Sequence, residues 1–186
     1  MQFTKHDSIY YYYNETMQID SNDKLAMFDL DGTIITTKSG NPVAKHINDW
    51  KFLHSNVITK MKDINKSHKI IIITNQNGIS KNLLTITDFT KKINNIFNKL
   101  EITPLLILVS TCKDYYRKPN VGMFKFIKKN IYQSISFNKK QSFYCGDAAG
   151  RTYETGEHDF SDSDMLFAKN NNIDFTPFNI LNAGFY

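Results

Sequence analysis

The chain has 186 residues, of which 41% are apolar, and its 23 Lys and Arg residues against 18 Asp and Glu residues give a formal net charge of +5. This apolar content supports a buried core in one domain and excludes an intrinsically disordered chain. The basic balance favours an anionic partner such as nucleic acid only weakly, because a solvated Lys-rich surface gives the same excess charge.

The N-terminal residues 1–23 are polar apart from Ile9 and a run of four tyrosines at positions 10–13. Aromatic side chains favour the pleated surface of a strand over a helix. The run therefore predicts an N-terminal arm or an edge strand that covers the core. A platform on which nucleic-acid bases stack is the alternative interpretation.

The rest of the chain, residues 24–186, alternates short apolar runs with amphipathic stretches. In chain order the patterns predict a strand at 24–30, a helix at 55–67, a strand at 69–74, a helix at 87–100, a strand at 104–110, a helix at 121–130, a strand at 142–146, a helix at 163–171 and a last strand at 173–175. Strands apolar on both faces that alternate with helices are typical of a parallel sheet covered on both sides. We therefore expect an α/β fold, a Rossmannoid parallel sheet in one domain, with its ligand at the C-terminal ends of the strands.

The two cysteines, Cys112 and Cys145, lie in or beside apolar runs. This predicts reduced thiols in a reducing compartment, and two cysteines are too few for a four-cysteine zinc site. Apolar runs such as residues 70–73 are far too short to span a membrane, and the N-terminus shows no charged head before an apolar stretch. The prediction is a soluble, intracellular, monomeric protein with no membrane partner.

The first predicted strand of the sheet ends in Asp29-Leu30-Asp31-Gly32. Two carboxylates two residues apart on an extended segment point to the same side, and they repel each other unless a cation lies between them. The functional interpretation is a nucleophile and a general acid/base beside Mg²⁺. An Asx turn that closes the strand is the alternative, because Asp-Gly is a common turn pair.

Polar residues also follow the other strands. The second strand ends at Thr74 and Asn75, and the threonine hydroxyl is suited to hold a phosphoryl oxygen. Lys118 follows the third strand and precedes a proline, which holds it extended, so its charge can offset that of a phosphoryl group. Asp147 follows the fourth strand, within reach of a metal over the neighbouring strand. Alone, the Thr74 segment fits a polar turn and Lys118 a surface lysine, but in this order on successive strand ends the signals together are strong and favour phosphoryl transfer.

From residue 24 to the C-terminus the chain resembles the haloacid dehalogenase (HAD) superfamily and, more narrowly, the phosphatase domain of polynucleotide kinase/phosphatases. The segments that carry the resemblance are FDLDGTIITTK at 28–38, TNQNGIS at 74–80, RKPNVGM at 117–123, GDAAGR at 146–151 and DFSDSDMLFA at 159–168. The first motif identifies only the superfamily, whereas the last two are more specific to DNA-end phosphatases. About 40 residues separate the first two motifs, so no large cap domain is expected.

The resemblance implies the roles of the site residues. Asp29 is the nucleophile, which forms an aspartyl-phosphate, and Asp31 is the general acid and then the general base. Thr74 binds the phosphoryl oxygens and Lys118 offsets their charge. Mg²⁺ is held by the Asp29 carboxylate, the Asp31 carbonyl and Asp147. This division agrees with phosphoryl transfer in general, in which a protein mainly positions groups and neutralises charge.

The implied substrate is a DNA strand end that bears a 3′-phosphate. The candidate substrate contacts are Lys38, Trp50, Asn75, Lys81, Arg117 and Arg151. Lys38 and Lys81 stand where relatives are expected to have arginine, and lysine is the weaker bidentate phosphate clamp. Trp50 either stacks a terminal base or anchors the core. Asp159 and Asp164 either support the metal site or cap the helix that follows them.

Two other functions fit the sequence less well. Phosphatases of histidinol phosphate or heptose bisphosphate share the TNQ-x-GI and RKP-x-x-GM runs, but they usually carry a Cys/His zinc loop, and here that region holds only Cys112. A non-catalytic DNA-end binding protein would require loss of a catalytic group, and all of them are present. No stretch matches the Gly-x-x-x-x-Gly-Lys-[Ser/Thr] phosphate loop, so the expected activity is that of a 3′-phosphatase without a kinase.

Overall fold

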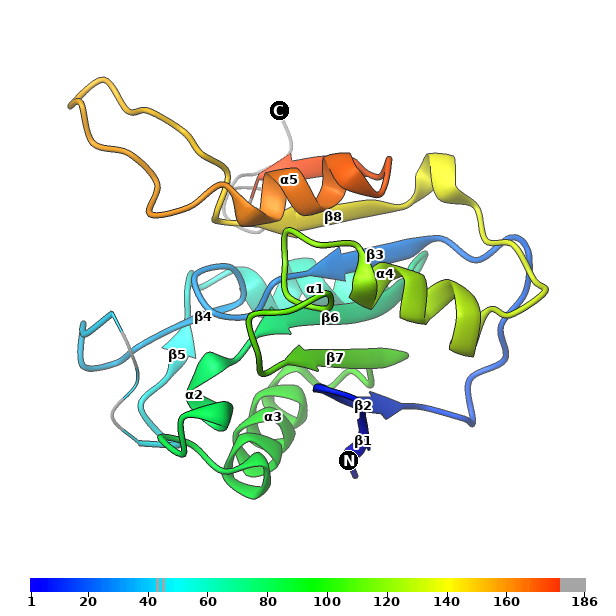
Figure 1. Cartoon of the computed structure of the whole chain (residues 1–186), viewed down its shortest axis with the longest axis horizontal. Helices are drawn as coiled ribbons and strands as arrows, with labels where there is room; N and C mark the ends of the chain where they lie inside the picture. The colour runs from blue at the N-terminus through cyan, green and yellow to red at the C-terminus, as the bar shows by residue number, and fades with distance from the viewer. Residues whose placement is uncertain (43, 45, 178–186) are drawn as a thin grey trace.

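The computed structural model describes residues 1–42, 44 and 46–177, and its centre is a seven-stranded sheet in the order β1-β2-β7-β6-β3-β8-β9 (Figure 1). The strands are β1 (Thr4–His6), β2 (Ile9–Tyr13), β3 (Leu25–Phe28), β6 (Lys69–Asn75), β7 (Leu106–Ser110), β8 (Phe143–Gly146) and β9 (Asp174–Pro177). The strands from β7 to β9 run parallel, and β1 and β2 add an antiparallel hairpin beside β7. The expected α/β fold with a mostly parallel sheet is confirmed.

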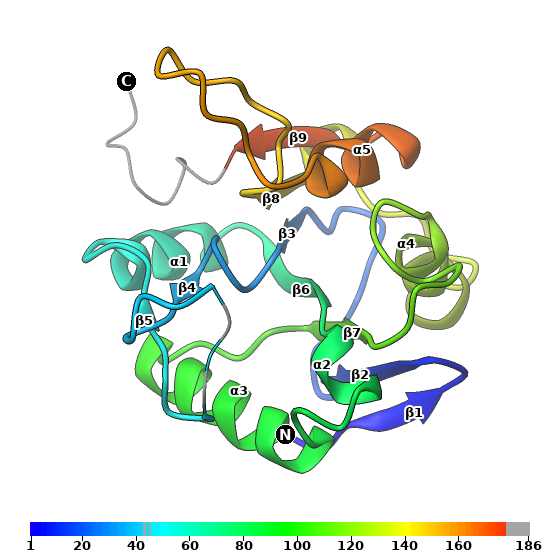
Figure 2. The same ribbon diagram turned by 60° about the vertical axis from the view of Figure 1, so that its left-hand side comes forward.

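Helices cover both faces of this sheet (Figure 2). They are α1 (Val57–Asn65), α2 (Asn77–Ser80), α3 (Ile86–Leu100), α4 (Gly122–Phe126), which continues as the π-helical turn η1 (Ile127–Ile131), the 3-10 turn η2 (Lys139–Gln141), and α5 (Ser163–Asn170). Helices α1 and α3 lie on one side and α4, η1 and α5 on the other. Each side has its own apolar core, so the sheet is buried on both faces.

The alternation of side chains along the strands decides which core each residue joins. In β6, Ile70 and Ile72 face α1 and α3, whereas Ile71 and Ile73 face α4 and α5. All four are at most 1% exposed, which is why this strand is a continuous apolar run and not an alternating one. The carboxyl ends of β3, β6, β7 and β8 consequently meet at one edge of a rigid sheet, at the left in Figure 1.

The tyrosine run forms β2, which pairs along its whole length with β7. Tyr10 and Tyr12 pack against the core on the α1 and α3 side, and Tyr11 and Tyr13 pack against the opposite core. All four rings are half-buried. The tyrosines thus extend both apolar faces of the sheet at its edge, and this packing leaves less of each ring for stacking on a base.

Three details differ from the sequence prediction. The helix expected at 121–130 is α-helical only to Phe126 and then widens into a π-helical turn. The last strand begins and ends later than expected, at 174–177. A two-stranded ribbon of β4 (Ile35–Thr36) and β5 (Lys51–Phe52) was not predicted, because strands of two residues carry no periodicity. In the described residues between β3 and β6, only this ribbon and α1 form regular structure.

Candidate active site

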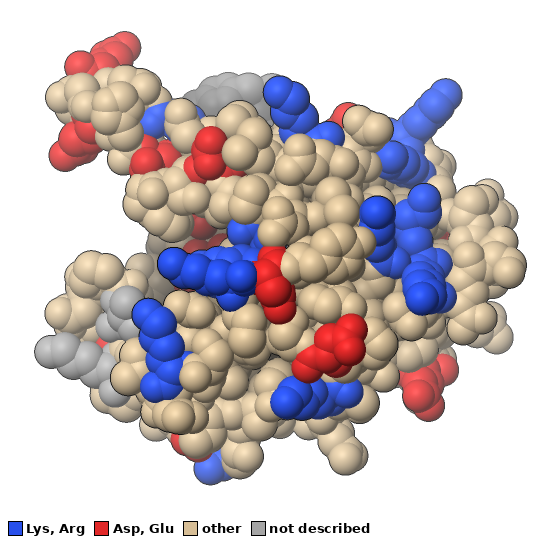
Figure 3. Space-filling view, in the orientation of Figure 1, with Lys and Arg blue, Asp and Glu red and all other residues tan. Residues whose placement is uncertain are grey.

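A cavity of about 430 Å³ lies at the carboxyl edge of the parallel strands. Its walls come from the ends of β3 and β6, the segment after β7, the loop after β8 and the start of α5; they include Asp29, Asp31, Thr74, Asn75, Arg117, Lys118 and Asp164. Figure 3 shows the hollow at the left of the molecule, with acidic atoms inside it and Lys or Arg side chains along its edge. Four sequence motifs that lie far apart in the chain therefore meet in one place.

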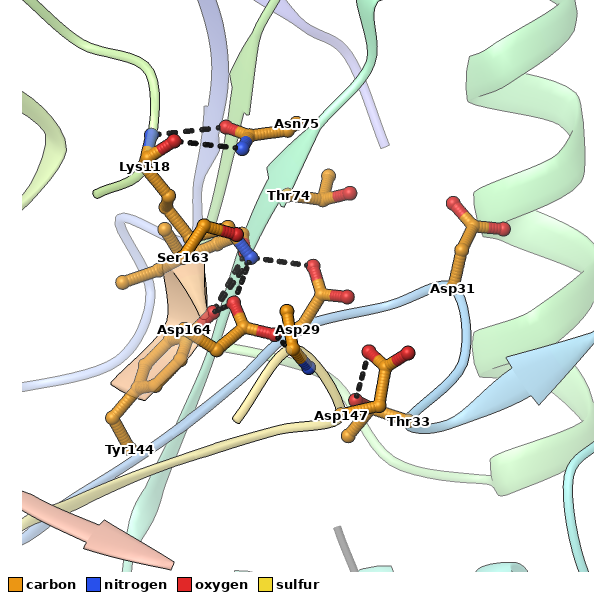
Figure 4. A network of polar contacts seen from close by, with 12 residues as sticks. Asp29, Asp31, Thr33, Thr74, Asn75, Lys118, Tyr144, Asp147, Ser163 and Asp164 are labelled. Atoms are coloured by element: carbon orange, nitrogen blue, oxygen red, sulfur yellow. Dashed lines mark hydrogen bonds and ion pairs between the residues drawn. The ribbon is translucent and has the colours of Figure 1, made fainter. Parts of the chain in front are cut away.

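Lys118 is the centre of this site (Figure 4). Its Nζ donates to Asp29 Oδ1 at 2.6 Å, to Asp164 Oδ1 at 2.7 Å and to the Tyr144 hydroxyl at 2.7 Å, and its side chain is only 2% exposed. Burial lowers the pKa of the Lys118 ammonium, but the charges of Asp164 and Asp29 outweigh this and raise its pKa above the ordinary value. Lys118 therefore keeps its positive charge in the closed interior.

Three carboxylates crowd together beside Lys118. Ligand oxygens of Asp29, Asp147 and Asp164 all lie within 4.8 Å of one another. Burial, and next the charge of Asp164, raise the pKa of the Asp147 carboxyl to about 6. Burial likewise raises the pKa of Asp29 well above its usual range, against the opposing charge of Lys118. An all-oxygen set of carboxylates that repel one another fits a hard divalent cation.

Two glycines allow these carboxylates to approach. A Cβ on Gly32 would lie 2.2 Å from Asp147 Oδ2, and a Cβ on Gly146 would lie 2.3 Å from Asp164 Oδ2. Gly32 also has a φ of +84°, which side-chain-bearing residues rarely adopt. Thr33 Oγ1 donates to Asp147 Oδ1 at 3.3 Å, so this turn also holds the carboxylate in place. The space that a side chain would fill is the space that the carboxylates need.

Asp31 lies apart from this cluster (Figure 4). The chain bends at Leu30, and both aspartate side chains line the cavity, as the sequence predicted, but their carboxylates are separated. The Asp31 carboxylate instead accepts hydrogen bonds from Gln76 Nε2 at 2.6 Å and from Lys92 Nζ at 3.1 Å. The two aspartates of one motif thus stand in different surroundings, and Asp31 is the exposed one.

Thr74 and Asn75 at the end of β6 serve different purposes. Thr74 lines the cavity, is 1% exposed, and its Oγ1 accepts from Gln76 Nε2 at 2.9 Å. Asn75 bonds the backbone of Lys118 twice, accepting from its N at 3.1 Å and donating to its O at 3.2 Å. Asn75 therefore fixes the segment that delivers Lys118, in addition to lining the cavity.

Asp164 and Asp159 have different hydrogen-bond partners. Asp164 accepts from Lys118, from the Tyr144 hydroxyl at 2.9 Å and from the backbone N of Ala148 at 3.1 Å, so it supports the site and does not cap α5. Asp159 binds the Arg151 guanidinium, with Nε–Oδ2 at 2.8 Å. Partial burial raises the pKa of Asp159, but hydrogen bonds from Arg151 outweigh it and lower this pKa to about 2. Among the described residues, Asp159 does not belong to the cluster of carboxylates formed by Asp29, Asp147 and Asp164.

The remaining candidate substrate contacts divide into three groups. Arg117 lines the cavity, and its buried Nη1 has no hydrogen-bond partner among the described residues. Lys38 and Lys81 are exposed, next to residues that line a second hollow. Trp50 is 6% exposed and belongs to the core between the sheet, α1 and α3. The interpretation of Trp50 as a stacking platform is therefore wrong, because its ring is packed against Phe52 and the Lys99 ammonium.

The second hollow, of about 960 Å³, adjoins the first and shares Asp31, Asn75 and Phe160 with it. It lies against the β4 segment, α2 and the start of α3, and the exposed side chains of Leu83 and Phe160 line it. Sequence reasoning did not single out Phe160, nor Gln76, Lys92 and Tyr144. Gln76 and Phe160 stand inside quoted motifs, but Lys92 and Tyr144 look like ordinary helix and strand residues.

The model of the family described as polynucleotide kinase 3 phosphatase matches residues 24–179. This chain belongs to that family. A relative from Schizosaccharomyces pombe, named bifunctional polynucleotide phosphatase/kinase, is 38% identical over 164 residues, which cover 86% of this chain and 38% of that protein. The polynucleotide 3′-phosphatase of Saccharomyces cerevisiae is 28% identical over 201 residues, covering 80% of this chain and 82% of its own. A viral protein of Autographa californica nuclear polyhedrosis virus, named only by its 20.8 kDa mass and gene position, is 38% identical over 157 residues and 83% of each chain.

Solved structures confirm the HAD-like fold of this polynucleotide kinase 3 phosphatase family member. A HAD-like phosphatase from Mesorhizobium loti superposes with a TM-score of 0.70 at 14% identity, covering 91% of this chain and 78% of its own. A D,D-heptose 1,7-bisphosphate phosphatase from B. bronchiseptica was solved with magnesium and phosphate. It superposes with a TM-score of 0.58 at 17% identity, covering 83% of this chain and 78% of its own. In the described residues, none of the helices combines the length and apolar character that crossing a membrane requires.

Gly32→Ala is expected to damage the cation site far more than Gly40→Ala. Both glycines have positive φ, of +84° and +75°, so both variants lose about 1–2 kcal/mol of stability from backbone strain. Only at Gly32 does the new Cβ displace Asp147, since at Gly40 it meets no described residue within 4 Å. Thermal denaturation and calorimetric titration with Mg²⁺ measure the two effects. Equal losses of Mg²⁺ affinity in both variants would contradict the role assigned to the Gly32 turn.

Cation affinity is expected to fall as the pH drops from 7 to 5. The pKa of Asp147 is raised to about 6, so below that pH the cation must displace a proton, whereas above pH 7 the carboxylate is already ionised. The apparent affinity should therefore decrease by up to about tenfold per pH unit below 6 and level off above 7. Mg²⁺ titrations at several pH values measure it, and Asp147→Asn should flatten the dependence. An affinity that is constant between pH 5 and 7 would contradict the assignment.

Proposed function

We propose that this chain is a Mg²⁺-dependent polynucleotide 3′-phosphatase, which removes the 3′-phosphate from DNA strand ends in end repair and hydrolyses it through an aspartyl-phosphate. The observation that carries the proposal is the buried Lys118, joined to Asp29 and Asp164 beside Asp147. Membership of the polynucleotide kinase 3 phosphatase family and the relatives named polynucleotide 3′-phosphatase support the substrate class.

The proposed reaction begins with attack of an Asp29 carboxylate oxygen on the phosphorus. The bond from phosphorus to the 3′-oxygen breaks, and Asp31 donates its proton to that oxygen. Asp31 then takes a proton from water, whose oxygen attacks the aspartyl-phosphate, so that phosphate leaves and both aspartates return to their starting states. The exposed position of Asp31 suits this role, because the group must exchange protons with the leaving oxygen and with water.

Charge neutralisation is the main task of the remaining residues. A dianionic phosphate cannot approach the Asp29 carboxylate unless positive charge offsets both. Lys118 supplies one such charge, held at Asp29 Oδ1. Asp29, Asp147 and the Asp31 carbonyl would hold Mg²⁺, with Asp164 in support, and the bound ion would supply the rest. Thr74, at the end of β6, would donate its hydroxyl hydrogen to a phosphoryl oxygen.

Substrate binding is assigned to Arg117 and to the second hollow. Arg117 lines the reaction cavity with a buried Nη1 that has no partner in the part of the chain the structure describes, as expected of a guanidinium that binds an anion. The hollow of about 960 Å³ continues from Asp31 and Asn75 and is large enough for a nucleotide next to the phosphate. Its amide-rich wall, with Asn41, Asn77 and Asn82, offers donors and acceptors for the sugar, the bases and the strand backbone.

The wild-type protein with Mg²⁺ is expected to release phosphate from a 3′-phosphorylated oligodeoxynucleotide, and not from its 5′-phosphorylated isomer or from histidinol phosphate. Asp29→Asn should lower the rate of phosphate release by roughly 10⁴-fold or more while the protein stays folded, because the nucleophile is lost. Colorimetric phosphate detection measures all arms. Release from histidinol phosphate alone would keep the mechanism and overturn the substrate. DNA binding without release from any donor would favour a non-catalytic end-binding protein.

Arg117→Ala is expected to raise the KM for the 3′-phosphorylated oligodeoxynucleotide by about 10- to 100-fold, because a charge-assisted hydrogen bond contributes roughly 1.5–3 kcal/mol. Arg117→Lys should recover part of this loss, since it restores the charge without the planar fork. Steady-state kinetics with the oligonucleotide measures the effect. The exposed Lys113, four residues upstream, serves as the control, and an equal KM increase in Lys113→Ala would show that only general surface charge matters.

A further inference from the structure

Helix α3 places one lysine on the side that faces the sheet. Its buried residues are Phe89, Ile93, Ile96, Phe97 and Leu100, together with Lys92. The Lys92 side chain is only 6% exposed, whereas that of its neighbour Lys91 is 60% exposed and pairs with Asp88 on the surface. A lysine among apolar side chains is costly to bury unless its ammonium has a specific partner. The position of Lys92 therefore calls for an explanation that helix packing does not give.

That partner is Asp31. Lys92 Nζ donates to Asp31 Oδ1 at 3.1 Å, across 61 residues of sequence, while the Asp31 side chain stays 51% exposed. The long buried stem anchors the ammonium, so the contact does not depend on two mobile surface side chains that must find each other. The contact therefore fixes Oδ1 of the Asp31 carboxylate from the α3 side and leaves the rest of the carboxylate open to the cavity.

Gln76 holds the other oxygen. Its Nε2 donates to Asp31 Oδ2 at 2.6 Å and also to Thr74 Oγ1 at 2.9 Å. One amide thus links the carboxylate to the hydroxyl that the proposed mechanism places against the phosphoryl group. Since Thr74 Oγ1 accepts the amide hydrogen, its own hydrogen is free to donate elsewhere, toward the cavity that Thr74 lines.

From this geometry we infer that Lys92 and Gln76 are positioning residues for the general acid/base of the proposed reaction, and that Lys92, although it also borders the second hollow, acts through Asp31. They hold the Asp31 carboxylate by both oxygens and prevent it from rotating toward the carboxylates of Asp29, Asp147 and Asp164. The inference rests on the proposed function in one respect, which is the role of Asp31 in protonating the leaving oxygen. It does not depend on the leaving group being a polynucleotide.

The test uses a series of aryl phosphates, from phenyl phosphate to dinitrophenyl phosphate, with the wild-type protein and with Lys92→Met. Protonation matters most for the poorest leaving group. Lys92→Met should therefore lower kcat/KM for phenyl phosphate by roughly 10- to 100-fold and for dinitrophenyl phosphate by less than about threefold. Lys91→Met, on the same helix but outside the core, should leave the whole series unchanged.

A second comparison separates positioning from a merely structural role. In an Asp31→Asn background, Lys92→Met should lower kcat/KM for phenyl phosphate by no more than about twofold, because a residue that acts through Asp31 has nothing left to position. If Lys92→Met folds poorly, Lys92→Gln replaces it in the comparison, because it also removes the charge and should give the same pattern. Thermal denaturation of each variant identifies poor folding.

Two outcomes would overturn the inference: an equal loss for every leaving group, or losses that multiply in the double variant. The second would mean that Lys92 binds substrate directly or only stabilises the fold. The proposed function fails differently. If the wild-type protein hydrolyses the aryl phosphates but not a 3′-phosphorylated oligodeoxynucleotide, the polynucleotide substrate is wrong and the role of Lys92 stands.

Discussion

One buried ammonium joins the parts of this site. Lys118 comes from the segment after β7 and binds Asp29 after β3, Tyr144 in β8 and Asp164 in α5. Burial of these charges is costly, and the cost is tolerable only because each charge has a partner at hydrogen-bond distance. One ammonium among three carboxylates nevertheless leaves two negative charges unbalanced, which is the charge that a divalent cation would bring. The charge of this carboxylate cluster therefore suits the divalent cation of the proposed chemistry.

The sheet makes this arrangement possible. Its parallel strands are apolar on both faces, so two cores fix them, and their carboxyl ends cannot separate to relieve the repulsion. Gly32 and Gly146 then remove the two side chains that would keep the carboxylates apart. A stable framework thus holds an unfavourable cluster of like charges, which is a common relation between a fold and its active site.

The fold and the motif residues of the site were predictable from sequence, whereas the contacts that hold those residues in place were not. Continuous apolar runs located the parallel strands, and a period of 3.6 located the main helices, because burial dictates those patterns. The motif residues Asp29, Thr74, Lys118 and Asp147 follow strand ends, where parallel topology brings them together. Lys92 gives no such signal, since its importance comes from a partner 61 residues away. Trp50 shows the opposite failure, because an aromatic residue near a motif can equally belong to the core.

The different surroundings of Asp29 and Asp31 agree with the different tasks proposed for them. A nucleophile must be ionised and sheltered when phosphate arrives, so Asp29 lies buried beside a lysine. A general acid/base must change its protonation twice in each cycle, so the role proposed for Asp31 calls for access to water and distance from the carboxylates of Asp29, Asp147 and Asp164. The bend at Leu30 supplies that distance, and Gln76 and Lys92 supply a fixed orientation that an exposed aspartate otherwise lacks. In the proposed mechanism, two identical side chains two residues apart differ in role because of what surrounds them, and not because of their spacing.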